Sequence, residues 1–246
     1  MAEPFRSALL LHGAGGGGWE WNVGHGVFDA AGLLVRSPDL QPATGGLAST
    51  SFADYLQQAR ASAAGLPRPR AVIGASLGGL LAIACADLAD ALVLVNPLPP
   101  SPWHARMPGR AWPDIVPWRS QARLAGSVRA LPDADPASAL YAFRRWRDES
   151  GRVLGEAARG IALPPPQCPV LCLASQEDED VPSRITRAMA AAWEADVMQL
   201  PSTSHAGPLL GRGAADAAAL ALAWLSAWGA ASGRTAGQAG PAGSAR

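Results

Sequence analysis

The residues best suited to chemistry are centred on Ser76, in the pentapeptide Gly74-Ala-Ser-Leu-Gly78. An apolar run typical of a buried strand leads into it, and a second apolar run typical of a buried helix follows at 80–86. The chain must therefore reverse within a residue or two, and the two glycines remove side chains that would collide there. The sequence predicts that Ser76 stands at the tip of a sharp turn with an exposed hydroxyl, as a nucleophilic serine does.

A serine hydroxyl becomes a nucleophile only when a base takes its proton and an acid orients that base. The pentapeptide alone also fits an ordinary turn capped by serine, so a base has to be found. Of the four histidines, His205 follows the last predicted strand directly and is the best candidate. His12 is expected to fix the glycine loop that follows it. His25 and His104 are expected to be ordinary polar residues, although His104 could face a substrate.

The acid is expected in the loop 175–182, which follows another predicted strand. Its four carboxylates belong to Glu177, Asp178, Glu179 and Asp180, and spacing alone does not choose among them. Functional groups on a parallel sheet gather at the carboxyl ends of its strands. One of these carboxylates should therefore meet His205 and Ser76 at that edge.

Short apolar strands alternate with helical patterns through most of the chain. Besides the strand before Ser76, the predicted strands are 7–11, 33–35, 91–95, 169–174 and 196–200. Helical spacing covers 52–64, 183–194 and 214–229. This alternation predicts an α/β fold with a mostly parallel central sheet of about six strands, flanked by helices.

The alternation breaks between residues 98 and 166, a proline-rich segment with an arginine-rich helical pattern near 141–152. This insertion is predicted to be a lid or cap on a core formed by residues 1–97 and 167–232. The tail at 233–246 is rich in glycine, alanine and serine, and is predicted to be disordered.

Composition excludes several classes of function. The 246 residues, 49% of them hydrophobic and 16% charged, can bury one large core. The formal net charge is zero and no basic tract occurs, so nucleic acid is not expected as a partner. All 20 basic residues are arginine, which excludes Schiff-base chemistry, lysine-bound pyridoxal phosphate, Ser–Lys dyads and P-loops. Neither a secretion signal nor a membrane span is recognisable.

The three cysteines, Cys85, Cys168 and Cys172, give no disulfide framework. Four residues of strand separate the last two by about 13 Å, which is too far for a disulfide. All three are expected to be small, reduced core residues, and this usage predicts a cytoplasmic location.

Together these motifs resemble the α/β-hydrolase superfamily. The matching segments are His12-Gly-Ala-Gly15, Gly74-Ala-Ser-Leu-Gly78, Ser175-Gln-Glu-Asp178 and Ser204-His205. They stand in the superfamily's order of serine, acid and histidine. The resemblance implies that Asp178 is the acid, with Asp180 as the fallback, and that the insertion takes the place of the lid. It also implies an oxyanion hole formed by the backbone amides of Ala14 and Leu77.

The expected function is a serine hydrolase acting on a small carboxylic ester or thioester. Ser76 is the nucleophile, His205 the base and Asp178 the orienting acid, with no metal or organic cofactor. One alternative is a C–C or cyanohydrin lyase with the same residues, because Trp19-Glu-Trp21 has some likeness to plant-type hydroxynitrile lyases. Those lyases favour a lysine near the pocket, which this chain lacks. A non-catalytic ligand receptor on the same fold is the third hypothesis.

Substrate choice is expected to lie in the insertion. Its four tryptophans are Trp103, Trp112, Trp118 and Trp146. Each one alone is expected to pack the lid onto the sheet, but together they predict an apolar wall for an acyl group. A competing hypothesis is that Arg144, Arg145 and Arg147 recruit an anionic carrier such as coenzyme A, whereas a solvated helix face is the default. The oligomeric state is not predicted.

Overall fold

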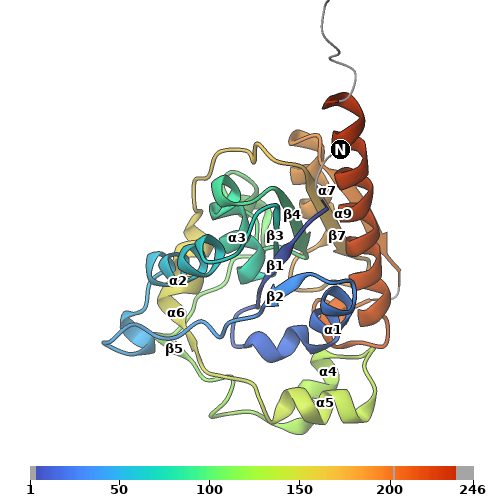
Figure 1. Cartoon of the computed structure of the whole chain (residues 1–246). Coiled ribbons are helices and arrows are strands. Elements are labelled where there is room, and N and C mark those ends of the chain that lie inside the picture. Colours follow the sequence, from blue (N-terminus) through green and yellow to red (C-terminus); the bar gives the residue numbers. More distant parts are fainter. Residues whose placement is uncertain (1–3, 202, 237–246) are drawn as a thin grey trace, which may run out of the picture.

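The computed structural model describes residues 4–201 and 203–236, and its centre is a six-stranded sheet (Figure 1). The strands are β1 (Ser7–Leu11), β2 (Leu34–Arg36), β3 (Arg70–Ala75), β4 (Ala91–Val95), β7 (Val170–Ser175) and β8 (Asp196–Leu200). Their order is β2-β1-β3-β4-β7-β8, and every neighbouring pair is parallel. The predicted sheet of about six strands is confirmed.

Helices cover both faces of this sheet, with α1 and α9 on one side and α2 and α3 on the other (Figure 1). The helices of the core are α1 (Asn22–Ala30), α2 (Phe52–Ala64), α3 (Leu77–Ala84), α7 (Ser183–Ala192), α8 (Gly207–Leu210) and α9 (Ala214–Ala236). Along β1, Leu9 and Leu11 face α2 and α3, whereas Ala8 and Leu10 face α1 and α9. Burial on both faces explains why this strand is apolar throughout.

Helix α2 begins and ends where its spacing predicts, because both ends carry local signals. The Ser51 hydroxyl accepts a hydrogen bond from the Asp54 amide, and the Asp54 carboxylate accepts one from the Ser51 amide. This capping box fixes the first turn at Phe52. Gly65 follows the last turn.

The insertion, residues 98–166, lies between β4 and β7. It contains a short 3₁₀ helix (Trp103–Arg106), β5 (Ile115–Val116), α4 (Leu124–Ala130), α5 (Pro136–Phe143), β6 (Glu149–Ser150) and α6 (Gly151–Arg159). Strands β5 and β6 form a separate antiparallel pair. Helices α4 and α5 lie together at the lower end of the molecule in Figure 1, whereas α6 packs into the core beside α2.

The predicted helix at 141–152 is wrong. Helix α5 ends at Phe143, and α6 begins only at Gly151. Two N-caps explain the difference, since Asp135 accepts the Ser138 amide at the start of α5 and Ser150 accepts the Val153 amide at the start of α6. Between them the chain forms a turn after α5 and then the short strand β6.

The structure also bears on the C-terminal tail, the cysteines and the predicted absence of a membrane span. Helix α9 continues to Ala236, past the start of the predicted disordered tail, and residues 237–246 lie outside the described residues. All three cysteines are free; Cys85 and Cys172 are buried, and Cys168 is half-buried. Among the described residues, no helix is both long and apolar enough to cross a bilayer.

Candidate active site

Ser76 occupies the single residue between β3 and α3, with φ 52° and ψ −118°. This strained backbone is rare for a residue with a side chain, and such outliers concentrate at functional sites. The reversal is very tight: a Cβ at Gly74 would lie 2.1 Å from the Gly78 carbonyl oxygen, and one at Gly78 would lie 2.1 Å from the Leu11 oxygen. The Ser76 amide donates to the Val95 carbonyl at 3.0 Å, which ties the turn to β4.

His205 and Asp178 form a direct pair. The Nδ1 atom of His205 lies 2.8 Å from Oδ2 of Asp178, whose side chain is fully buried. The other oxygen, Oδ1, accepts the backbone amides of Asp180 and Val181 at 2.9 and 2.8 Å. Of the four carboxylates in this loop, the structure places Asp178 on the histidine, whereas Asp180 contributes its amide to the same acid.

This pairing changes the proton affinity of the imidazole. Burial of His205 would by itself lower its pKa, but the hydrogen bond and the negative charge of Asp178 outweigh burial and raise that pKa above its ordinary value. Asp180 and Glu20 add to the increase. With Nδ1 directed at Asp178, Nε2 is the nitrogen left to exchange protons.

Asn96, the residue after β4, joins the loops of the site. Its side-chain nitrogen donates to the His205 carbonyl oxygen and to the Ser175 hydroxyl, both at 2.8 Å, and its Oδ1 accepts the Ser175 amide at 2.8 Å. Asn96 directly follows Val95, whose carbonyl accepts the Ser76 amide. The end of β4 therefore fixes the Ser76 turn, the start of the Asp178 loop at Ser175 and the His205 loop. The sequence alone does not reveal this positioning role, because Asn96 is not an acid and its partners lie 79 and 109 residues away.

The insertion also reaches the histidine loop. The Ser204 hydroxyl donates to Asp133 Oδ1 at 2.6 Å, and the Ser204 amide donates to Oδ2 at 3.1 Å. Asp133 stands between α4 and α5, so a residue far from His205 in the sequence holds its immediate neighbour.

Residues 13–18, which the resemblance implies to form part of an oxyanion hole and which we call the oxyanion loop, lie directly against Ser76. A Cβ placed on Gly13 would lie 3.4 Å from the Cβ of Ser76. The amides on either side of Ala14 are engaged by carboxylates: Gly13 donates to Glu20 at 2.9 Å, and Gly15 donates to Glu149 at 2.8 Å. In the described part of the chain, no hydrogen bond uses the amides of Ala14 and Leu77. These are the two donors implied for the oxyanion hole.

Glu20 and Glu149 are functional candidates that sequence reasoning missed. Both are buried, with 6% and 3% of their surface exposed. Burial raises the pKa of Glu20 to about 7, against the opposing effects of the Gly13 hydrogen bond and the nearby His205. An acid between two tryptophans was the available signal for Glu20. Glu149 gave none, because it lies 134 residues from the glycine it binds.

The other histidines have structural partners. His12 is buried; its Nε2 accepts the Leu40 amide at 2.9 Å, so Nδ1 carries the proton donated to the Gly13 carbonyl at 2.7 Å. Burial lowers the pKa of His12 to about 4, and the ring is neutral. His25 bonds the Ser37 hydroxyl, and His104 packs against Gly160 at the end of α6.

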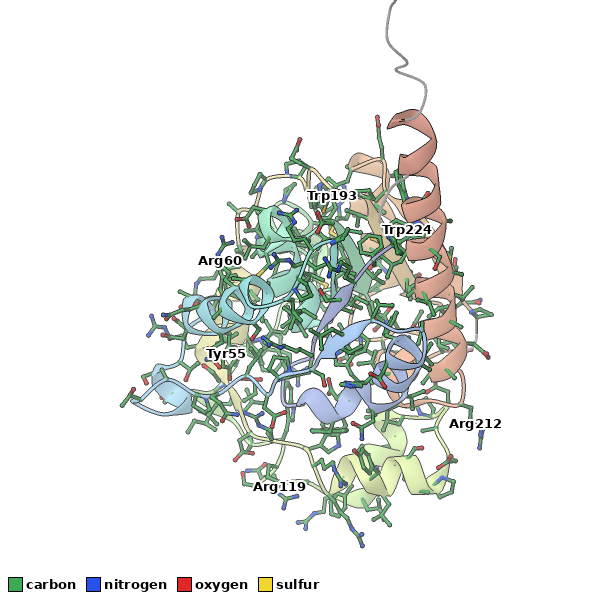
Figure 2. The ribbon with its side chains drawn as sticks, in the orientation of Figure 1. Tyr55, Arg60, Arg119, Trp193, Arg212 and Trp224 are labelled. Carbon is green, nitrogen blue, oxygen red and sulfur yellow. The ribbon has the colours of Figure 1, made fainter. Side chains whose placement is uncertain are left out.

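The four tryptophans of the insertion fall into two groups, two beside the oxyanion loop and two against the core. Trp118 packs against Gly15 of the oxyanion loop, and Trp112 contacts Trp118 edge-on at 6.0 Å between ring centroids. The other two pack the insertion onto the core. Trp103 meets Trp193 at 5.3 Å, beyond the end of α7, and Trp146 meets Trp19 at 5.3 Å. Figure 2 labels Trp193 at the upper end of the molecule, away from α4 and α5.

Two of the three arginines proposed to bind a carrier are engaged. The Arg147 guanidinium donates to the Leu40 carbonyl at 2.5 Å, and its backbone amide donates to the Gly15 carbonyl at 2.7 Å. Arg145 stacks on the Tyr141 ring at 3.7 Å. Arg144 is exposed.

The chain belongs to the α/β-hydrolase family, whose sequence profile, described as "Alpha/beta hydrolase family", matches residues 8–223. The resemblance drawn from the motifs is thereby confirmed. No curated protein sequence matches the chain significantly.

Solved structures of the same fold are similar over nearly their whole length. A methylesterase from Arabidopsis has 16% identity and a TM-score of 0.68, covering 89% of this chain and 98% of that chain. Polyneuridine aldehyde esterase has 16% identity and a TM-score of 0.69, over 88% and 99%. Tomato methylketone synthase I has 15% identity and a TM-score of 0.70, over 91% and 100%. At such identities the likeness establishes the fold alone.

Proposed function

We propose that the protein is a serine hydrolase that cleaves a small carboxylic ester or thioester through an acyl-enzyme. The observation that carries this proposal is the 2.8 Å contact between His205 Nδ1 and the buried Asp178 carboxylate, on loops at the same carboxyl edge of the parallel sheet as the strained Ser76 turn. The pair supplies an oriented base, and the turn supplies a half-buried serine hydroxyl. Residues 98–166 act as the lid in this proposal.

Acylation begins when Ser76 Oγ attacks the acyl carbon while His205 Nε2 takes its proton. The amides of Ala14 and Leu77 stabilise the oxyanion of the tetrahedral intermediate, which can contribute several kcal/mol to lowering the barrier. The imidazolium then gives its proton to the departing alcohol or thiol. Water, activated by His205, releases the carboxylic acid and restores Ser76. Asp178 stabilises the imidazolium in both half-reactions.

The acyl group is proposed to be apolar. Trp118 and Trp112 place aromatic surface beside the oxyanion loop, where the acyl chain of a bound ester would lie. Recruitment of coenzyme A by the arginines is less well supported, because the Arg145 guanidinium stacks on Tyr141 and the Arg147 guanidinium donates to the Leu40 carbonyl oxygen.

A panel of p-nitrophenyl esters of increasing acyl length, with matched thioesters, tests the proposal. We expect wild type to turn over neutral esters and to prefer apolar acyl groups, and we expect Ser76→Ala to abolish turnover. Cleavage of a cyanohydrin with no ester turnover would favour the lyase hypothesis. Binding without any turnover would favour a receptor.

A further inference from the structure

Two buried carboxylates hold the oxyanion loop from opposite sides of Ala14. Glu20, in the segment leading to α1, accepts the Gly13 amide at 2.9 Å. Glu149, in strand β6 of the insertion, accepts the Gly15 amide at 2.8 Å. The amide between these two hydrogen bonds is the one proposed to meet the oxyanion.

The Glu20 carboxylate fills the inside of the loop. A Cβ added to Gly16 would lie 2.0 Å from Glu20 Oε1, so the loop can close around the carboxylate only with glycine at this position. The Gly16 amide donates to the Gly13 carbonyl at 3.3 Å and completes the turn. The glycine run is thus shaped around this acid.

Glu149 is itself rigidly held. Its Oε1 accepts the Tyr55 hydroxyl at 2.8 Å and the Ser150 amide at 2.7 Å, leaving Oε2 for Gly15. Tyr55, labelled in Figure 2, reaches from α2 toward the start of α6. The nearby Arg147 amide donates to the Gly15 carbonyl at 2.7 Å, so the insertion binds both the backbone N–H and the backbone C=O of Gly15.

We propose that Glu20 and Glu149 are positioning residues that aim the Ala14 amide at the oxyanion, one from the core and one from the insertion. This inference rests on the proposed hydrolase function. The direction of an N–H bond follows from the peptide planes on either side, and both neighbouring amides are tied to fixed acceptors. Donors that need no reorientation during the reaction are the ones that stabilise a transition state most.

Glu20 contributes a hydrogen bond and a charge, and the two contributions can be separated. His205, Glu149 and Arg147 act on this carboxyl group, and burial brings its pKa to about 7. A protonated carboxyl still offers its carbonyl oxygen to Gly13, so the loop is held in both states. Glutamine also keeps an acceptor but carries no charge, whereas methionine of similar length keeps neither.

Kinetics of paired variants test the proposal. We expect Glu20→Met and Glu149→Met to lower kcat by about 10- to 100-fold with KM changed by less than about threefold. We expect the glutamine variants to keep kcat within about threefold of wild type. Glu156→Met is the matched control. Glu156 also lies in the insertion and accepts a backbone amide, but that amide belongs to Phe52 of α2 and not to the oxyanion loop, so kcat should be unchanged. Equal losses in glutamine and methionine variants would overturn the proposal.

Amide hydrogen exchange provides a readout that does not need turnover. We expect the Gly13 and Gly15 amides to exchange slowly in wild type and at least about tenfold faster in the corresponding methionine variant, with β1 unchanged. If one methionine variant fails to fold, the other carries the same test, Glu20→Met at the Gly13 amide or Glu149→Met at the Gly15 amide. Unchanged exchange would contradict the positioning role. If the methionine variants exchange faster as expected but the wild-type protein turns over no ester, only the hydrolase proposal is contradicted.

Discussion

At the scale of single residues, the site depends on one hydrogen bond to one carboxylate. Asp178 holds His205 by Nδ1, so Asp178→Asn should favour the wrong tautomer and lower turnover on the order of 10⁴-fold, as for the serine-protease acid. Asp180→Asn is the matched control, because Asp180 contributes its backbone amide and its charge but no side-chain hydrogen bond to this network, and it should change turnover much less. Steady-state kcat values decide between them; the opposite ranking would move the acid to Asp180.

The raised pKa of His205 predicts the acid limb of the pH profile. Imidazole must be neutral to take the Ser76 proton, so kcat/KM should fall as pH drops through this raised pKa, above the ordinary value for histidine. Glu20→Gln removes one of the charges that raise it, and should move the limb to lower pH. A limb that shifts upward, or not at all, would contradict the coupling between these residues.

Glu20 also predicts how stability depends on pH. Its pKa is about 7 in the fold and about 4.5 in the unfolded chain, so the native state binds the extra proton. The free energy of unfolding should therefore decrease as pH rises between these values, by roughly 2–3 kcal/mol in total. Glu20→Gln should lack this decrease, and urea unfolding at pH 5 and pH 8 measures the difference. A wild-type protein that gains this amount on the same pH rise would contradict it.

At the scale of elements, the helices and strands of the core can be predicted from local sequence patterns, whereas the structure of the insertion cannot. Helix α2 carries its own capping box, and β1 is buried on both faces, so short stretches of sequence specify them. The insertion is held by pairs distant in sequence, such as Tyr55 with Glu149, 94 residues apart. No periodic pattern encodes such a contact. For the same reason spacing left four possible acids, and packing placed Asp178 on His205.

The contact between the insertion and the histidine loop makes its own prediction. Asp133→Ala removes both hydrogen bonds from Ser204 and should lower kcat by about tenfold with little change in KM, because His205 loses its support. Asp135→Ala, which removes only the cap of α5, is the control. It should cost about 1 kcal/mol of stability and no activity. Equal effects on kcat would show that the insertion needs only to be folded.

At the scale of the whole molecule, the tryptophans of the insertion should separate into two roles. Trp118→Ala should raise KM for long-chain esters more than for acetate esters, since Trp118 lies against the oxyanion loop. Trp103→Ala should instead lower the free energy of unfolding by about 3 kcal/mol, with acyl preference unchanged, because Trp103 packs on Trp193. If Trp103→Ala changed acyl preference and Trp118→Ala did not, the acyl pocket would have to lie near Trp103 instead.

The central claim is that Ser76 is the activated nucleophile of the molecule. Its most direct test is labelling with a fluorophosphonate, followed by mass spectrometry of the modified peptide. We expect one adduct, on Ser76, formed rapidly in wild type and not formed in Ser76→Ala, which should also lose turnover by roughly 10⁴- to 10⁶-fold while remaining folded. An adduct on another serine, or ester turnover that survives in Ser76→Ala, would contradict the claim.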